Sequence, residues 1–247
     1  MTDKQLLFDR FAHFLRSLPD AEAIDDLTLT DEQALTQRAD FFLQNRGYIV
    51  ELKLLSTDTR HRMEPILEPH RSRPEFALLS RHTLDTKLEL LPDGDELRNR
   101  LHTAITESVE GLIKKANRQI RHTRRSFAVE TAGSILVILN DDVAQLSPPI
   151  VAKRAAQALQ KRRTGGAGLR FTEIDTVWIV SEAHYVQVTD RSRAVPDVIF
   201  PTFSLNAKSI AEFVRTLSPA WAAFNDKGFA EFGQEYLEKF RFQRRRK

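Results

Sequence analysis

The sequence contains no cysteine, which excludes disulfide bonds, cysteine-based zinc sites and catalysis by a thiol. No stretch approaches the roughly 18 apolar residues that a membrane-spanning helix needs, and the first residues lack the basic and then apolar pattern of a signal peptide. Internal repeats, heptads and collagen-like periods are also absent. These absences agree with a reducing compartment, and we expect a soluble, cytoplasmic protein that does not bind membranes.

A phosphate-binding loop of the nucleotide-triphosphatase kind is missing as well. The glycine-rich stretch 165–168 lacks both the Gly-Lys-Ser/Thr ending of such a loop and the helix that should begin after it. We interpret this stretch as a flexible connector. Enzymes that bind nucleotide triphosphates through such a loop are therefore disfavoured.

The length of 247 residues and the hydrophobic content of 41% allow a sizeable core. We expect a single domain that carries an insertion at about 56–101 and a basic tail at about 236–247. The insertion differs in composition, because it contains four prolines and three of the seven histidines. Its features are compatible with substrate contact, a lid, partner binding or a homodimer interface.

The net charge of +3 conceals an uneven distribution of basic residues. Residues 114–170 contain twelve Lys or Arg against three acids, and residues 239–247 contain six against none. Concentrated basic elements are expected where one face of a protein binds a polyanion such as nucleic acid. The alternative is that each basic helix face is simply solvated. For the tail, stacking on a single strand and a solvated terminus are equally compatible.

A β-hairpin is predicted near the N-terminus. The runs 39–43 and 48–55 are apolar and rich in aromatic and β-branched residues, and the Gln-Asn-Arg-Gly sequence at 44–47 supplies turn chemistry. A hairpin that closes symmetrically pairs residues whose numbers sum to 91. Apolar residues then lie on both faces, which indicates that the hairpin is buried rather than a solvated surface feature.

Three charged residues, Asp40, Glu51 and Lys53, interrupt this hairpin. Symmetric pairing places Phe42 opposite Ile49 and Asp40 opposite Glu51, with Lys53 on the same face. Two carboxylates opposite one another destabilise a strand pair unless a cation lies between them. Carboxylate oxygens are the ligands that Mg²⁺ and Mn²⁺ prefer, so the pattern predicts part of a metal site.

An Asp followed after ten residues by Glu-Leu-Lys resembles the motif of the PD-(D/E)XK nuclease superfamily, which includes restriction endonucleases. The resemblance implies that Asp40 and Glu51 hold Mg²⁺ or Mn²⁺ and that the carbonyl of Leu52 adds a ligand. It also implies that Lys53 activates or orients the attacking water. The position before Asp40 is Ala39, where the family name has proline, and many members lack that proline.

The remaining pattern predicts an α/β protein. We expect helices at 3–18, 97–127, 149–163 and 207–224, a short helix that begins at Thr30, and further strands at 134–140, 176–181 and 185–188. A strand, a long helix and a second strand form a crossover unit, so strands 48–55 and 134–140 should be parallel. We therefore predict a mixed central sheet flanked by helices, and the resemblance implies a restriction-endonuclease-like core.

The helix at 97–127 carries candidates for two roles. A basic stripe runs along it and is a candidate nucleic-acid-binding surface: Lys114, Arg118, Arg121 and Arg125. The resemblance implies that this helix presents a Lys or Gln toward the site. Gln119 is therefore a catalytic candidate, and Lys115 is a second one for which solvation is favoured.

Glu32 is a further acid, and we expect it to lie in the first turn of the short helix rather than to bind metal. Some relatives of the resembled family add an acid from an upstream helix to the metal, and Glu32 is the candidate in this chain. The pattern favours a simpler arrangement, in which Thr30 caps the short helix together with Gln33.

The sequence thus predicts a Mg²⁺- or Mn²⁺-dependent nuclease that hydrolyses phosphodiester bonds. DNA is favoured over RNA because most members of the resembled family cut DNA, and a role in defence or repair is implied only at the level of the family. The alternative is a non-catalytic nucleic-acid-binding or scaffold protein that retains the nuclease fold. An intact Asp, Glu and Lys set in a buried hairpin speaks against that alternative.

Overall fold

The computed structural model describes residues 6–55, 60–74, 88–165, 167–189, 192–231 and 242–244. The chain divides into two compact units. Unit 1 comprises Met1–Ser56 and Val109–Lys247, and unit 2 comprises Thr57–Ser108. The bounds of unit 2 lie close to those of the predicted insertion at about 56–101. No helix within the described residues is long and apolar enough to cross a membrane.

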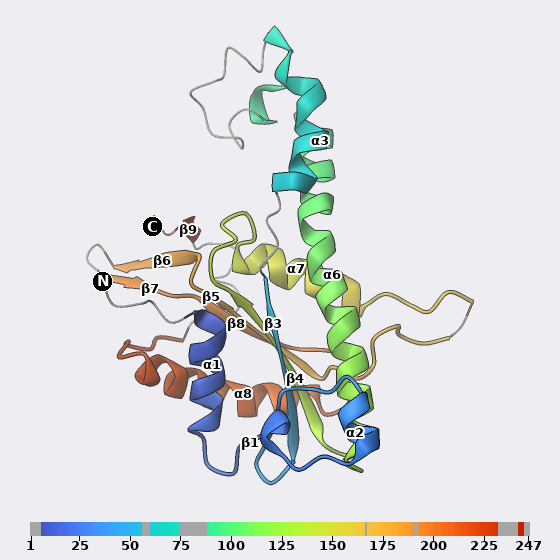
Figure 1. The fold of residues 1–247 in the computed structure, drawn as a ribbon. Helices are drawn as coiled ribbons and strands as arrows, with labels where there is room; N and C mark the ends of the chain where they lie inside the picture. Colours follow the sequence, from blue (N-terminus) through green and yellow to red (C-terminus); the bar gives the residue numbers. More distant parts are fainter. Residues whose placement is uncertain are drawn as a thin grey trace. The chain divides into compact units, whose positions relative to one another are not determined.

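Unit 1 is built on a six-stranded mixed sheet with the order β1-β2-β3-β4-β5-β8 (Figure 1). The strands are β1 (Glu22–Ala23), β2 (Phe41–Leu43), β3 (Tyr48–Leu54), β4 (Gly133–Asn140), β5 (Thr176–Ser181) and β8 (Asp197–Pro201). The three central strands β3, β4 and β5 are parallel, and the pairs outside them are antiparallel. The predicted α/β class, the mixed sheet and the parallel pairing of β3 with β4 are confirmed.

Helices lie against both faces of this sheet. They are α1 (Leu7–Arg16), α2 (Asp31–Leu35), α6 (Gly94–Ser126), α7 (Pro148–Leu159) and α8 (Ala207–Phe224). On one face, Phe11 of α1 contacts Trp178 of β5 at 5.0 Å and Trp221 of α8 at 4.8 Å between ring centroids. On the other face, Phe42 of β2 packs 5.2 Å from Phe127, the residue that follows α6. The central strands are therefore buried on both sides, as their continuous apolar sequences predict.

A second, three-stranded sheet has the order β7-β6-β9. It is formed by β6 (His184–Thr189), β7 (Ser192–Ala194) and β9 (Phe242–Arg244). Strand β9 belongs to the predicted basic tail, and the rest of that tail lies outside the described residues. The sequence did not predict β1, β7, β8 or β9, which are short strands.

Unit 2 contains α3 (Arg60–Arg71) and the first part of α6. Pro65 and Pro69 lie inside α3, although proline removes a backbone donor and disfavours a helix interior. Asp93 lies 2.7 Å from Arg73, and this pair connects the segment after α3 to the residue that precedes α6. The predicted insertion therefore has helical structure of its own.

Candidate metal centre at the β2–β3 hairpin

The hairpin adopts the predicted register. Phe42 pairs with Ile49, and Phe41 pairs with Val50, so the numbers of paired residues sum to 91. Phe41, Phe42 and Leu43 are all buried. The turn that joins the strands places Gln44, Asn45 and Arg46 at positive φ values of 49°, 52° and 65°. Both strands of the hairpin are therefore buried elements of the sheet, and the alternative of a solvated surface hairpin does not hold.

The backbone leaves this register at Asp40. Its N–H donates to the carbonyl of Val50 at 3.1 Å, and Val50 is already the partner of Phe41. Two residues therefore oppose one, as in a β-bulge, and such bulges redirect side chains. The carbonyl of Asp40 also accepts from Ile24 N–H at 2.9 Å, which joins it to the segment that follows β1. The predicted direct pairing of Asp40 with Glu51 is corrected to this arrangement.

The redirected carboxylate of Asp40 binds the neighbouring strand. Its Oδ2 accepts a hydrogen bond of 2.6 Å from the N–H of Leu52. In an extended strand the N–H and C=O of one residue point to the same side. The carbonyl of Leu52 therefore points toward the side of β3 on which Asp40 lies, and β2 has already ended at this level. Asp40 and the Leu52 carbonyl together provide two kinds of oxygen donor.

Glu51 is fully buried, with none of its surface exposed. One carboxylate oxygen, Oε1, forms an ion pair with the ammonium group of Lys53. The other oxygen, Oε2, is buried and accepts no hydrogen bond from a described donor, and the Glu51 carboxyl lies within hydrogen-bonding reach of the Asp40 carboxyl. In the sheet, Glu51 pairs with Leu136, so β4 places an apolar residue beside it. A buried carboxylate oxygen without a donor is unusual, because its desolvation is not compensated.

The electrostatics of the two carboxylates follow from this burial. Burial and, after it, the nearby charge of Asp40 raise the pKa of Glu51 to about 8, although Lys53 opposes the change. Burial also raises the pKa of Asp40, and the hydrogen bond from Leu52 N–H and the charge of Lys53 partly offset the effect. Protonation or a cation is therefore needed to stabilise the pair.

Lys53 supplies part of that positive charge. Its side chain is 15% exposed and lies two residues after Glu51 on the same strand face. The side chain of Lys53 thus remains partly exposed while its ammonium group pairs with a fully buried acid. This position allows Lys53 to hold a water or a phosphate oxygen near the carboxylates, because the ammonium group has three donors.

Helix α6 fixes the backbone just before Asp40. The side-chain amide of Gln119 donates to the carbonyl of Arg38 at 2.9 Å, and the N–H of Ala39 donates to Oγ1 of Thr123 at 2.7 Å. These two backbone groups belong to the same peptide unit. Gln119 and Thr123 are four residues apart and lie on one side of the helix. We call this arrangement the peptide clamp.

The peptide clamp changes the role of the predicted candidate Gln119. Its amide is engaged by the backbone before Asp40, so it acts as a positioning residue in this structure. Thr123, which the sequence analysis missed, is fully buried and is its partner. The only sequence signal for Thr123 is its spacing, because it lies three residues after the buried Ile120. Its partner is 84 residues away, and local patterns do not encode such a contact.

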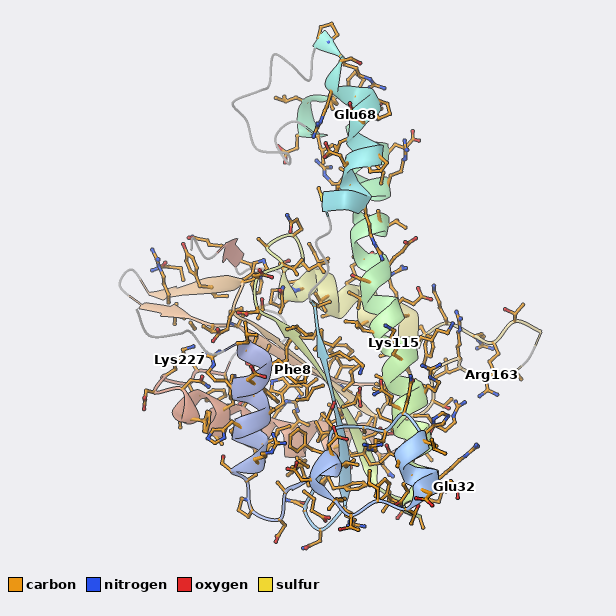
Figure 2. The ribbon with its side chains drawn as sticks, viewed as in Figure 1. Phe8, Glu32, Glu68, Lys115, Arg163 and Lys227 are labelled. Carbon is orange, nitrogen blue, oxygen red and sulfur yellow. The ribbon has the colours of Figure 1, made fainter. Side chains whose placement is uncertain are left out.

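Two further acids, Glu32 and Asp25, lie upstream of the hairpin. Glu32 is exposed on α2 (Figure 2), and the predicted capping box of Thr30 and Gln33 is present. Asp25, which the sequence analysis did not single out, lies close enough to raise the pKa of Asp40 by its charge. It pairs with Arg38 at 2.8 Å. Asp25, rather than Glu32, is therefore the upstream acid whose charge acts on Asp40.

The four basic residues predicted on α6 divide into two groups. Arg121 forms an ion pair with Glu173 at 3.1 Å, so its charge is compensated within the protein. Lys114 and Arg125 are exposed, and the exposed Arg118 donates to the side chain of Gln37. The available basic surface on this helix thus contains Lys114, Arg118 and Arg125. Lys115 is exposed as well, in agreement with the favoured interpretation that it is solvated.

The donor set at this site consists of two carboxylates and one carbonyl. Within the described part of the chain, no group of three or more His, Cys, Asp or Glu side chains is placed to hold a metal ion. The oxygen donors from Asp40, Glu51 and Leu52 nevertheless suit a hard divalent cation. The Oε2 of Glu51, which has no described donor, is the atom that such a cation would compensate.

Comparisons with protein-family models, with curated proteins and with solved structures found no match to this chain.

Proposed function

We propose that this protein is a metal-dependent nuclease that hydrolyses phosphodiester bonds with Mg²⁺ or Mn²⁺. The observation that carries the proposal is the fully buried Glu51, whose Oε2 accepts no hydrogen bond from a described donor and whose carboxyl lies beside that of Asp40 and the ammonium group of Lys53. The order of the elements supports a restriction-endonuclease-like core. The hairpin β2–β3 carries the charges, and the crossover through α6 leads to the parallel strand β4.

Asp40, Glu51 and the carbonyl of Leu52 would hold the metal. Such an ion, when bound, polarises a phosphate oxygen and lowers the pKa of a bound water. The high pKa values of both carboxyls fit this role, because two desolvated carboxylates without a cation retain protons. A cation removes the repulsion between Asp40 and Glu51 that the apo site contains.

The side chains of the protein supply orientation and charge. Lys53 would hold the attacking water or a phosphate oxygen, since its side chain is partly exposed and its ammonium group lies beside Glu51. The peptide clamp of Gln119 and Thr123 would keep Asp40 in place. Exposed basic residues on α6 would bind backbone phosphates. DNA is proposed over RNA from the family resemblance alone, and a defence or repair role rests on the same resemblance.

A non-catalytic nucleic-acid-binding protein is the second candidate. The observation in its favour is the ion pair between Lys53 and Glu51, which is how a purely structural buried charge would be compensated. This ion pair does not account for Asp40, whose pKa stays raised beside it. A retained pair of desolvated carboxylates stabilises neither the fold nor a phosphate contact.

Cleavage assays separate these candidates. Supercoiled plasmid DNA would be incubated with the protein in Mg²⁺, in Mn²⁺ and in EDTA. We expect nicking or degradation only with metal, and we expect Glu51→Gln to abolish it. Glu32→Gln, which removes an exposed acid on α2, is the matched control and should retain activity. Cleavage that persists in EDTA, or in Glu51→Gln, would refute the proposal.

A further inference from the structure

Residues 161–165 and 167–170, which follow α7, form the two sides of a short antiparallel hairpin. Arg162 and Leu169 form an antiparallel bridge, and the N–H of Arg170 donates to the carbonyl of Lys161 at 2.8 Å. Gly165 and Gly168 adopt φ values of +76° and +116°, which side chains disfavour. The predicted flexible connector is therefore a paired element with a glycine-containing tip. We call residues 161–165 and 167–170 the basic hairpin.

The basic hairpin carries a surplus of positive charge. Its four cations, which are all exposed, are Lys161, Arg162, Arg163 and Arg170, and its sequence contains no acid. Arg162 and Arg163 form no ion pair with any described residue. Figure 2 shows Arg163 on the segment that projects beside α6. Clustered like charges repel one another, and a polyanion would relieve this repulsion.

One acid connects this hairpin to α6. Glu110 of α6 lies 2.7 Å from the ammonium group of Lys161, 3.1 Å from Arg154 and 3.6 Å from Arg170. The contact with Lys161 and the other two charges lower the pKa of Glu110, so it remains ionised. A single carboxylate thus holds three cations at one place and cannot neutralise all of them.

Glu110, the acid that contacts the basic hairpin, lies on the same side of α6 as two exposed cations. Lys114 and Arg118 follow Glu110 at successive intervals of four residues, so the three side chains lie along one side of the helix. At 1.5 Å per residue, Arg118 lies about 12 Å along the axis from Glu110. The next residue, Gln119, holds the backbone that precedes Asp40. Arg118 itself donates to the side chain of Gln37, three residues before Asp40, so these cations extend from the basic hairpin to the segment that precedes the candidate metal centre.

We propose that the basic hairpin is an arm that binds the backbone phosphates of duplex DNA and, with Lys114 and Arg118, guides one strand toward the carboxylates. A span of about 12 Å corresponds to about three to four nucleotides of one B-form strand. The proposal rests on the proposed nuclease function for the site to which the strand is led. The binding itself does not depend on that function.

The composition of the hairpin favours duplex DNA over other partners. Its exposed residues are Lys, Arg, Thr, Gly and Ala, whereas the centres of protein interfaces use aromatic or large apolar anchors. It carries no aromatic side chain for stacking on unpaired bases. Two-stranded ribbons fit the major groove, and arginine and lysine contacts to phosphates are independent of sequence. The arm should therefore bind DNA backbone without sequence preference.

Equilibrium binding of the full chain to a fluorescent DNA duplex, in EDTA and over a salt series, tests this arm. Arg162→Ala with Arg163→Ala should weaken binding on the order of ten- to a hundredfold near 0.1 M salt, and reduce the slope of log affinity against log salt by about 1.8. The charge reversal to Glu at both positions should weaken binding further. The control removes an exposed cation on α8, Lys208→Ala, and should leave the slope unchanged.

Two outcomes would overturn the proposal that the basic hairpin binds DNA. An unchanged affinity and slope in the hairpin variant is one, and an equal loss in the α8 control is the other. Because EDTA prevents metal-dependent cleavage, this test is separate from the test of the nuclease. A protein that cleaves DNA but binds it without the hairpin would retain the nuclease proposal. If the protein binds DNA through the hairpin but never cleaves it, the proposal of a DNA-binding hairpin stands and the nuclease proposal fails.

Discussion

Replacing Glu51 by glutamine should change how the stability of the metal-free protein depends on pH. The pKa of this buried carboxyl is raised from 4.5 to about 8 by burial and by Asp40. A carboxyl with a raised pKa stabilises the folded state while it is protonated. That contribution is complete below about pH 4.5 and is lost as the pH rises through about 8. Glutamine cannot titrate, so the variant lacks this dependence.

The magnitude follows from proton linkage. Between about pH 5 and 8 the folded protein binds one more proton at Glu51 than the unfolded chain, so the free energy of unfolding falls by about 1.4 kcal/mol per pH unit. The whole range corresponds to at most about 5 kcal/mol. Glu22, Glu110 and Glu182 have lowered pKa values, and their contributions are lost only as the pH falls below about 4.5. They therefore act outside this window.

Urea denaturation in EDTA at several pH values would measure the effect. Trp178 and Trp221 are buried in the core and report unfolding by fluorescence. We expect the stability of the wild type to fall between about pH 5 and 8 relative to Glu51→Gln. Glu32→Gln, the exposed-acid control, should follow the wild type. Parallel curves for the wild type and Glu51→Gln across this range would refute the reasoning.

Three further predictions concern neighbouring residues. Thr123→Val should lower the free energy of unfolding by about 1–3 kcal/mol and weaken Mn²⁺ binding, because the N–H of Ala39 loses its acceptor. Thr123→Ser keeps the hydroxyl and should restore both the stability, measured by denaturation, and the Mn²⁺ affinity, measured by calorimetry. Lys53→Ala should reduce DNA turnover by orders of magnitude while filter binding shows a nearly unchanged affinity. A fall in DNA affinity as large as the fall in turnover would assign Lys53 to DNA binding instead. Arg121→Ala should leave DNA affinity and its salt dependence unchanged, since Arg121 pairs with Glu173, and a smaller salt slope would show that it contacts phosphate.

The sequence predicted the local features of the fold because short-range patterns encode them. The turn residues at 44–47 and symmetric closure of the hairpin placed Phe42 opposite Ile49, and the register confirms that pairing. The long helix between two apolar strands implied that β3 and β4 are parallel, which is also confirmed. The capping box of Thr30 with Gln33 depends on residues three apart and was predicted correctly.

Features that depend on distant contacts could not be predicted. The bulge at Asp40 depends on the hydrogen bond to Val50 and on the contact of its carbonyl with Ile24 N–H. The contact between Ala39 and Thr123 joins residues that are 84 positions apart. The ion pair of Arg121 with Glu173 likewise joins α6 to the segment before β5. A basic residue on a helix looks the same in sequence whether its partner is a phosphate or a distant acid.

Calorimetric titration of the metal-free protein with Mn²⁺ tests the central claim most directly. The measurement would be made at about pH 7 in two buffers with different ionisation enthalpies, which counts the protons released. Because the pKa of Glu51 is about 8, we expect one binding site and the release of about one proton. Glu51→Gln should lose both the affinity and the proton release. An absence of binding by the wild type, or equal affinity and proton release in Glu51→Gln, would contradict a metal centre at Asp40 and Glu51.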